Sequence, residues 1–285
     1  MKKLISLMIA ALMIAGCMVA FTGCGEKKVA IGVQAGTTGE AFLAGDEGFG
    51  FAGYSNVDAK AYDNAALAVK DLKSNNVKYV VIDASVAKSL VAADSASIKV
   101  IDYALTSEDY GIGVDKNQPE LLAKINKILA EKKAEIAAIY EKYANVNDDN
   151  SATWTGDTIP AGTYDASKDQ LVVATNAAFA PYEFTVGNNF AGIDMEIAKL
   201  IADELGMELV IKDMDFSAVV TSIGKNGVDI ACSGLTINPA RQKVVDFSDP
   251  YEQGSYQVII ALKDDTTFDG CKSAKEVLDI LASLK

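Results

Sequence analysis

The sequence predicts an α/β protein with mostly parallel sheets flanked by helices. Short apolar runs of strand length recur along the chain, beginning with VAIGV at 29–33. Between them lie segments with apolar residues at helical spacing, such as 63–75. This alternation is typical of βα units. The composition, 50% hydrophobic and 23% charged, is that of an ordinary globular protein.

The first 24 residues are expected to be a lipoprotein signal peptide and to lie outside the fold. Two lysines precede an uninterrupted apolar run, which is the arrangement of a bacterial export signal. Cys17 and Cys24 both end a sequence like the one that lipoprotein signal peptidase cleaves. Cys24 is the better candidate for lipidation, because polar GEKK follows it while apolar MVAF follows Cys17. The alternative is an uncleaved membrane helix, since the run approaches the roughly 20 residues that span a bilayer. Either way the rest of the chain would face outward at the cell membrane, anchored by lipid if Cys24 is modified.

The first half of the remaining chain should contain strands and helices in turn. A capped helix is predicted at 63–75, because Asp63 and Asn64 precede apolar residues at helical spacing. Residues 119–144 begin with proline and carry a strong apolar face, which predicts one or two helices that pack on the core. The other elements expected here are strands at 29–33, 79–83, 99–105 and 110–116 and a helix at 85–92.

The character of the chain changes at 145–170. This stretch is rich in Asn, Asp, Gly, Ser and Thr and has no apolar period, so we expect a linker or long loop. The alternation then resumes, and local pattern alone would give two α/β domains joined by this linker. The elements expected after it are strands at 171–175, 208–213, 228–234 and 255–263 and helices at 192–206, 216–227 and 272–285.

The bulk properties exclude several classes of function. A net charge of −13 argues against nucleic-acid binding, which needs a basic surface. The chain has no histidine, which excludes Ser-His-Asp and Cys-His catalysis and argues against a zinc enzyme. Cys232 and Cys271 are too few and too distant for a disulfide framework or a metal site, so we expect free thiols. No cofactor or metal is implied.

Several segments carry a family resemblance. In the second half these are NAAFAPYEF, GIDMEIAKLIADELG and SGLTINPARQKVVDFSDPY; in the first half they are IGVQAGTTG, VIDASVA and YGIGVDKNQPELLAKINKIL. Together they resemble the type II extracytoplasmic solute-binding proteins of amino-acid ABC transporters, family 3. The resemblance implies a two-lobed periplasmic-binding-protein type II fold and covers most of the chain except 145–170.

The order of these segments differs from that of the family. There the NAAFAPYEF lobe comes first and the IGVQAGTTG segment follows; joining Lys285 to Lys27 would restore that order. We therefore expect a circular permutant, with 145–170 joining the ancestral termini. The resemblance then implies that lobe 2 combines 28–110 with 264–285, and that lobe 1 is 111–263. The alternative is that two truncated copies of the family lie in tandem. This is disfavoured because the two halves of the chain match different lobes and do not repeat each other.

Free amino-acid recognition needs a fixed cation, neutral donors and a nearby anion. Arg241 offers a planar fork suited to a carboxylate. Gly234 and Thr236, at the end of a strand, can add donors. The resemblance implies that Asp83 meets the ligand's ammonium, although helix capping is a simpler role for it.

The resemblance also implies roles around the ligand's side chain. Thr38 should reach the ligand's carboxylate from the opposite lobe, and Gln34 should read its side chain. Phe179 and Phe216 match two aromatic residues that enclose that side chain, with ordinary core packing as the alternative. Asn176 stands where relatives that bind Gln or His often have Asp, which weakens the case for a cationic ligand.

The expected function is an extracytoplasmic lipoprotein that binds a polar amino acid between closing lobes and delivers it to an ABC transporter permease. The same fold hosts dehydratases of small carboxylic acids, but no motif here supplies an obvious general acid or base. A ligand sensor is a third reading that would need a separate signalling partner.

Overall fold

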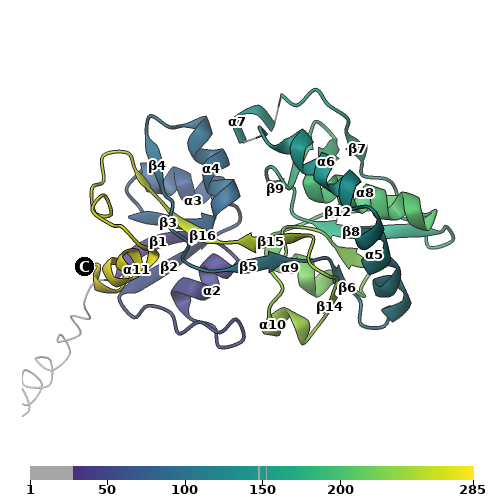
Figure 1. Cartoon of the computed structure of the whole chain (residues 1–285), viewed down its shortest axis with the longest axis horizontal. Coiled ribbons are helices and arrows are strands. Elements are labelled where there is room, and N and C mark those ends of the chain that lie inside the picture. The colour runs from purple at the N-terminus through teal and green to yellow at the C-terminus, as the bar shows by residue number, and fades with distance from the viewer. Residues whose placement is uncertain (1–27, 147, 152) are drawn as a thin grey trace, which may run out of the picture.

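The computed structural model describes residues 28–146, 148–151 and 153–285 and shows two lobes side by side (Figure 1). Each lobe is built around a five-stranded sheet. The predicted signal segment, with Cys17 and Cys24, lies outside the described residues. Within the described ranges, no helix is long and apolar enough to cross a membrane.

Lobe 2 contains the sheet with strand order β2-β1-β3-β16-β4. Strand β1 pairs in parallel with β2 and β3, whereas β16 runs antiparallel to β3 and β4. The sheet is therefore mixed, although the sequence predicted it to be mostly parallel. Its strands are β1 (Val29–Gln34), β2 (Val57–Tyr62), β3 (Tyr79–Asp83), β4 (Ile98–Ile101) and β16 (Gln257–Leu262).

Helices cover both faces of the lobe 2 sheet, which explains why β3 is buried along its whole length. Val80 and Ile82 of β3 face one apolar cluster, which includes Leu72 of α3; Tyr79 and Val81 face the other, which includes Leu281 of α11. This alternation follows from the two-residue period of a strand. The helices are α2 (Thr38–Ala44), α3 (Ala65–Lys73), α4 (Ala84–Ala93) and α11 (Ala274–Ser283).

Lobe 1 contains the sheet with strand order β12-β8-β13-β6-β14. The two pairs made by β8 are parallel, and the two made by β6 are antiparallel. A smaller antiparallel sheet, β7-β11-β10-β9, adjoins it. The strands are β6 (Gly113–Val114), β7 (Ile159–Pro160), β8 (Gln170–Thr175), β9 (Ala178–Phe179), β10 (Glu183–Val186), β11 (Asn189–Ala191), β12 (Glu208–Asp213), β13 (Ile230–Ala231) and β14 (Asp246–Phe247).

Most predicted helices of lobe 1 are present. The segment 119–144 forms two helices, and the predicted helix at 216–227 ends early, because Ile223 leaves the helical conformation. The linker contains one helical turn, α7, and strand β7. The helices are α5 (Pro119–Glu131), α6 (Lys133–Tyr143), α7 (Asp148–Ser151), α8 (Ile193–Leu205), α9 (Phe216–Ser222) and α10 (Pro239–Gln242).

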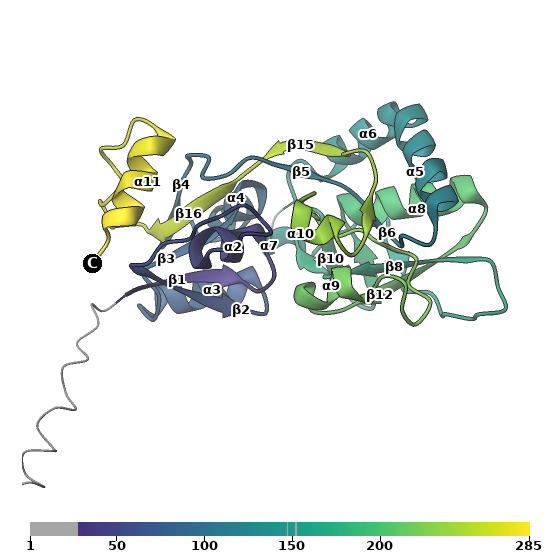
Figure 2. The same ribbon diagram turned by 90° about the horizontal axis from the view of Figure 1, so that it is seen from below.

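Two neighbouring strands connect the lobes. Strands β5 (Glu108–Tyr110) and β15 (Glu252–Ser255) pair antiparallel and run side by side between the two halves (Figures 1 and 2). The predicted crossing after 263 is therefore wrong: the chain crosses at β15, before β16. The reason is that β16 is apolar on both faces and fills the gap between β3 and β4 of the lobe 2 sheet.

The two ends of the described chain lie in the same lobe. Asn56 connects them, since its backbone carbonyl accepts from Val29 N at 2.9 Å. Its side-chain Nδ2 donates to the carbonyls of Leu281 at 3.0 Å and Leu284 at 3.1 Å. Strand β1 and helix α11 thus meet at one edge of lobe 2 (Figure 1).

Candidate functional site

The candidate site lies where strand ends from both lobes face each other. Gln34 ends β1 and Asp83 ends β3 in lobe 2. In lobe 1, Asn176 follows β8 and Gly234 lies shortly after β13. Because parallel strands bring their carboxyl ends to one edge of a sheet, these four positions gather at the two edges that meet.

Arg241 is the only arginine in the sequence, and it is buried at this junction with 6% of its surface exposed. Asn238 caps the short helix α10, because its Oδ1 accepts from Arg241 N at 2.9 Å. This hydrogen bond fixes the backbone from which the Arg241 side chain extends. Nη1 donates to the carbonyl of Thr236 at 2.9 Å, and Nη2 crosses to the carbonyl of Gly36 in lobe 2 at 3.0 Å. Burial lowers the pKa of Arg241 to about 10, so the group is a cation at neutral pH.

Two aromatic rings flank this cation. The guanidinium carbon lies 5.5 Å from the ring centroid of Phe216 in lobe 1 and 5.5 Å from that of Phe49 in lobe 2. Both distances are within cation–π range. Phe216 was predicted to enclose a ligand side chain; in this structure it packs on Arg241, and Phe49 was not predicted at all.

A chain of side-chain hydrogen bonds runs across the junction. Thr38 Oγ1 donates to Thr236 Oγ1 at 3.1 Å, and Thr236 Oγ1 donates to Glu108 Oε2 at 2.6 Å. Glu108 Oε1 also accepts from Gln257 Nε2 at 3.0 Å. Thr38 and Thr236, which were predicted as separate ligand contacts from the two lobes, are thus bonded directly to each other, and a buried carboxylate from connecting strand β5 joins them.

Asp83 is a second buried carboxylate beside this chain. It is 4% exposed, and Tyr110 Oη donates to its Oδ1. Asp83 stands at the N-cap position of α4, yet its side chain makes no capping hydrogen bond, so the simpler role considered for it is absent. Burial, followed by the nearby Glu108 carboxylate, raises the pKa of Asp83 to about 7.

Gln34 and Asn176 form a separate contact between the lobes. Gln34 Nε2 donates to Asn176 Oδ1 at 3.0 Å, and both residues are buried. Asn176 is held from its other end as well, because its Nδ2 donates to the carbonyl of Met214 at 2.8 Å. The structure therefore brings these two predicted residues together as a pair.

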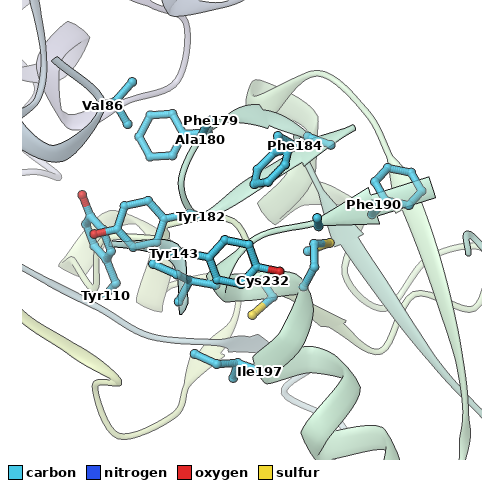
Figure 3. Packing of buried hydrophobic residues seen from close by; sticks show 14 of the residues in the cluster. Val86, Tyr110, Tyr143, Phe179, Ala180, Tyr182, Phe184, Phe190, Ile197 and Cys232 are labelled. Carbon is cyan, nitrogen blue, oxygen red and sulfur yellow. The ribbon is translucent and has the colours of Figure 1, made fainter. Parts of the chain in front are cut away.

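Phe179 and Gly234 occupy different positions from those expected. Gly234 N–H donates to Asp194 Oδ2 at 2.7 Å inside lobe 1, so it is not the free donor that we predicted. Phe179 stacks on Tyr182 with ring centroids 5.9 Å apart, and a Cβ on Gly234 would lie 3.0 Å from its ring. Phe179 belongs to a cluster of buried apolar residues that also includes Val86 of α4, and both are labelled in Figure 3.

Tyr110, Glu108 and Gln257 are site residues that sequence reasoning missed. Glu108 precedes the predicted strand at 110–116 among polar residues that gave no sign of burial, Tyr110 is the first residue of that strand, and Gln257 lies within the predicted strand at 255–263. Their burial depends on the pairing of β5 with β15 and of β16 with β3.

The junction thus combines one buried cation, two buried carboxylates and several neutral donors from both lobes. Such a set suits a small zwitterion, with its anionic end at the guanidinium and its cationic end at the carboxylates. Cys232 and Cys271, as expected, are free. Within the described ranges, no group of three or more acidic or cysteine side chains is placed to hold a metal ion.

Comparison with known proteins gives a consistent family. The model of the bacterial extracellular solute-binding proteins, family 3, matches residues 171–283. The arginine-binding extracellular protein ArtP of Bacillus subtilis (strain 168) is 36% identical over 113 residues, which are 40% of this chain and 42% of ArtP. ABC transporter arginine-binding protein 1 of Escherichia coli (strain K12) is 31% identical over 104 residues, 36% of this chain and 42% of that protein.

An enzyme also matches: the cyclohexadienyl dehydratase of Pseudomonas aeruginosa is 30% identical over 99 residues, 34% of this chain and 37% of the enzyme. The chain spans less than half the length of these curated relatives in its matches. Among solved structures, the arginine-bound form of domain 1 from TmArgBP is 35% identical, with 42% of this chain and 96% of that one covered and a TM-score of 0.30.

Proposed function

The chain belongs to the bacterial extracellular solute-binding proteins, family 3, and from this premise we propose that it binds a free polar amino acid between its two lobes. The observation that carries the proposal is the position of Arg241. The only arginine of the chain is buried between the lobes, 3.0 Å from the carbonyl of Gly36 in lobe 2 and on the same hydrogen-bonded network as Glu108.

The proposed binding mode uses charge complementarity. The ligand's α-carboxylate takes donors from Arg241 and the hydroxyl of Thr38, and its ammonium lies near Asp83 and Glu108. A ligand that contacts both lobes stabilises the closed arrangement by its differential affinity for that state, with β5 and β15 as the connection about which the lobes move. The names of the matching relatives report arginine binding, and this supports a ligand of the amino-acid class.

Calorimetric titration of the purified protein tests this function. After a thermal-shift screen of the twenty amino acids plus citrulline and ornithine, we expect at least one to raise the melting temperature and to bind saturably. Arg241→Ala should abolish that binding while the circular dichroism spectrum is retained, whereas Lys243→Ala, an exposed cation two residues away, should leave it unchanged. Unaltered affinity in Arg241→Ala would refute the site.

We propose a binding protein without turnover as the main function, and a dehydratase of small carboxylic acids as the second candidate. The match to the Pseudomonas enzyme favours the latter, and a carboxyl such as Asp83, with a pKa near neutrality, is the type of group a dehydration needs. Incubation with a cyclohexadienyl carboxylic acid separates the two: release of water and carbon dioxide would establish the enzyme, and saturable amino-acid binding without product would exclude it.

We further propose that the protein is a lipoprotein of the extracytoplasmic face that delivers its ligand to an ABC transporter permease. The signal-like sequence up to Cys24 supports the anchor, and the family supports the transport role. Cys24→Ser should move the protein from the membrane fraction to the soluble fraction of cells, while Cys17→Ser should not. Membrane retention of Cys24→Ser would place the anchor elsewhere.

The same proposal includes the circular permutation. The closeness of the chain ends supports it, since Asn56 bonds to both β1 and the end of α11. A chain in which Lys285 is joined to Lys27, and which begins and ends within 145–170, should fold and bind the same ligand with similar affinity. Failure of this rearranged chain to fold would count against the permutation without affecting the binding function.

A further inference from the structure

We infer that a second cavity between the lobes, separate from the candidate site, binds a small molecule that carries a primary ammonium group. The cavity has a volume of about 530 Å³. Its walls come from α4 of lobe 2, from the end of α6 and the start of the linker in lobe 1, and from Glu252 of connecting strand β15. Arg241, Thr38, Thr236 and Asp83 do not line it.

Two hydroxyl groups in this cavity have no hydrogen-bond partner. Ser85 Oγ, in the first turn of α4, and Tyr140 Oη, on α6, are buried atoms without a partner in the described structure. The hydroxyl of Tyr182 is a close neighbour of Ser85 Oγ but is not placed to bond to it. Buried polar groups are nearly always paired, so two unpaired hydroxyls that line one cavity indicate that a polar group of a ligand occupies it.

Glu252 supplies the charge that selects among polar ligands. It is the first residue of β15 and is half-buried. Burial raises the pKa of its carboxyl, and the nearby Tyr140 hydroxyl lowers it in part without forming a hydrogen bond. Lys88 also lines the cavity, but its ammonium pairs with Asp102 at 3.0 Å instead of with Glu252. A half-buried carboxylate in this position favours a ligand that brings a positive charge.

A primary ammonium group matches these three side chains. It carries one positive charge and three N–H donors. The Glu252 carboxylate, Ser85 Oγ and Tyr140 Oη can each accept one of these donors, and the bond between ionised partners is of the stronger kind. Glu252 would repel an anion, and a neutral alcohol would leave the carboxylate without a counter-charge. The rings of Tyr143 and Tyr182, which also line the cavity, can cover the carbon chain of the amine.

Nuclear magnetic resonance titration of the purified protein with n-butylammonium chloride tests the inference. This small ligand should bind saturably, with a dissociation constant on the order of millimolar, and should shift the amide resonances of Ser85, Tyr140 and Glu252. Tetramethylammonium has the charge without N–H donors, and 1-butanol has the carbon chain without the charge. Both should bind at least about fivefold more weakly. Equal affinity for either control, or the absence of a saturable shift with n-butylammonium, would overturn the inference.

Substitution of the carboxylate provides the second arm. Glu252→Gln keeps the size of the side chain and removes its charge, so the affinity for n-butylammonium should fall about tenfold or more. Glu141→Gln removes an exposed carboxylate on α6 and should keep the wild-type affinity. Equal affinities in Glu252→Gln and Glu141→Gln would show that Glu252 takes no part in binding and would overturn the inference.

Substitution of the two hydroxyls separates a ligand site from a role in the fold. Tyr140→Phe and Ser85→Ala should each weaken n-butylammonium binding about two- to fivefold. Neither should lower the free energy of unfolding measured in urea without the amine, because neither hydroxyl has a partner to lose. Lower stability of both variants with unchanged affinity for the amine would assign the hydroxyls to the fold and contradict the inference.

Asp83→Asn distinguishes this cavity from the candidate site, where buried carboxylates also attract an ammonium group. In the same titration, Asp83→Asn and the wild type should bind n-butylammonium equally. Loss of binding in Asp83→Asn with retention in Glu252→Gln would place the amine in the candidate site. That result would overturn this inference, while the proposed binding of an amino acid by the candidate site would stand.

Discussion

Thr38 Oγ1 lies 3.1 Å from Thr236 Oγ1, and this contact connects helix α2 of lobe 2 to the end of the β13 segment of lobe 1. Thr236 Oγ1 in turn donates to the carboxylate of Glu108, which lies on strand β5 between the lobes. The contacts between the lobes and the candidate site therefore share the same side chains, so changes at the site should alter both these contacts and the affinity for a ligand.

Thr38→Val should weaken ligand binding about 5- to 20-fold, because valine keeps the shape of threonine and removes a hydroxyl that bonds across the lobes. Isothermal titration calorimetry measures this change. Thr221→Val, which removes an exposed hydroxyl on α9, is the matched control and should retain the wild-type affinity. Equal affinities in Thr38→Val and the wild type would show that this hydroxyl takes no part in binding.

Gly36→Ala should prevent closure. Gly36 has φ of +78°, and a Cβ there would lie 3.1 Å from the Cα of Ser217 in the opposite lobe. Gly50→Ala is the control: φ is +83°, but no atom lies within 4 Å of the added carbon. Both variants should lose about 1 kcal/mol of stability from backbone strain.

Only Gly36→Ala should also lose affinity, and its small-angle X-ray scattering should show no compaction when ligand is added. Compaction equal to that of Gly50→Ala would contradict this account of closure.

Asp83 should make the stability of the unliganded protein depend on pH. Burial and Glu108 raise its pKa from 3.8 to about 7. At pH values between these two pKa values, the Asp83 carboxyl keeps its proton in the folded protein but has lost it in the unfolded chain. The contribution of Asp83 to the stability of the folded state is therefore present in full at low pH and is lost as the pH rises toward 7. At about 1.4 kcal/mol for each pKa unit, the change over the whole range is on the order of 4 kcal/mol.

Urea unfolding of the wild type and of Asp83→Asn, each at about pH 5 and about pH 8, measures this effect. The quantity compared between the two proteins is the fall in the free energy of unfolding from the lower to the higher pH. The variant should show a smaller fall in the free energy of unfolding, because asparagine cannot titrate. Asp58→Asn removes a surface carboxylate and is the control for the loss of a charge. A pH dependence in Asp83→Asn as steep as that of the wild type would exclude Asp83 as its source.

Asn56→Ala should destabilise lobe 2 by about 1–3 kcal/mol, because it removes two hydrogen bonds to the end of α11. Chemical denaturation measures the loss, and hydrogen exchange should locate it at α11 and the edge of β1. Asn117→Ala, whose side chain bonds only within its own loop to Asp115, should cost less. Hydrogen-exchange rates that rise equally in both lobes would contradict the local role of Asn56 at α11 and β1.

The elements with a clear period were predictable from the sequence. Helix α8 matches the predicted 192–206 within a residue at each end, and strand β3 matches 79–83, because apolar spacing and strand-forming residues both favour these structures there. The family and the candidate residues Thr38, Thr236, Gln34 and Asn176 could also be anticipated, since they depend on local motifs. The direct contacts of Thr38 with Thr236 and of Gln34 with Asn176 could not, because they join residues far apart in the chain.

The location of β16 could not be predicted in this way. The apolar run at 258–262 fits the centre of either sheet equally well, and only the pairing of β16 with β3 and β4 assigns it to lobe 2. The same holds for Gly234, whose amide could have faced a ligand but meets Asp194 instead. Periodicity specifies which face of an element is apolar, but not which partner will cover it.

The sequence by itself determined the two-lobed α/β family, the single arginine and the residue types around it. Only the tertiary structure decided that Glu108 and Tyr110 join Asp83 at the junction, and that Gln34 presents an unpaired acceptor. The physical reason is that these properties arise from contacts between residues far apart in the chain. Their burial and hydrogen bonding exist only once both lobes and the connecting strands are in place.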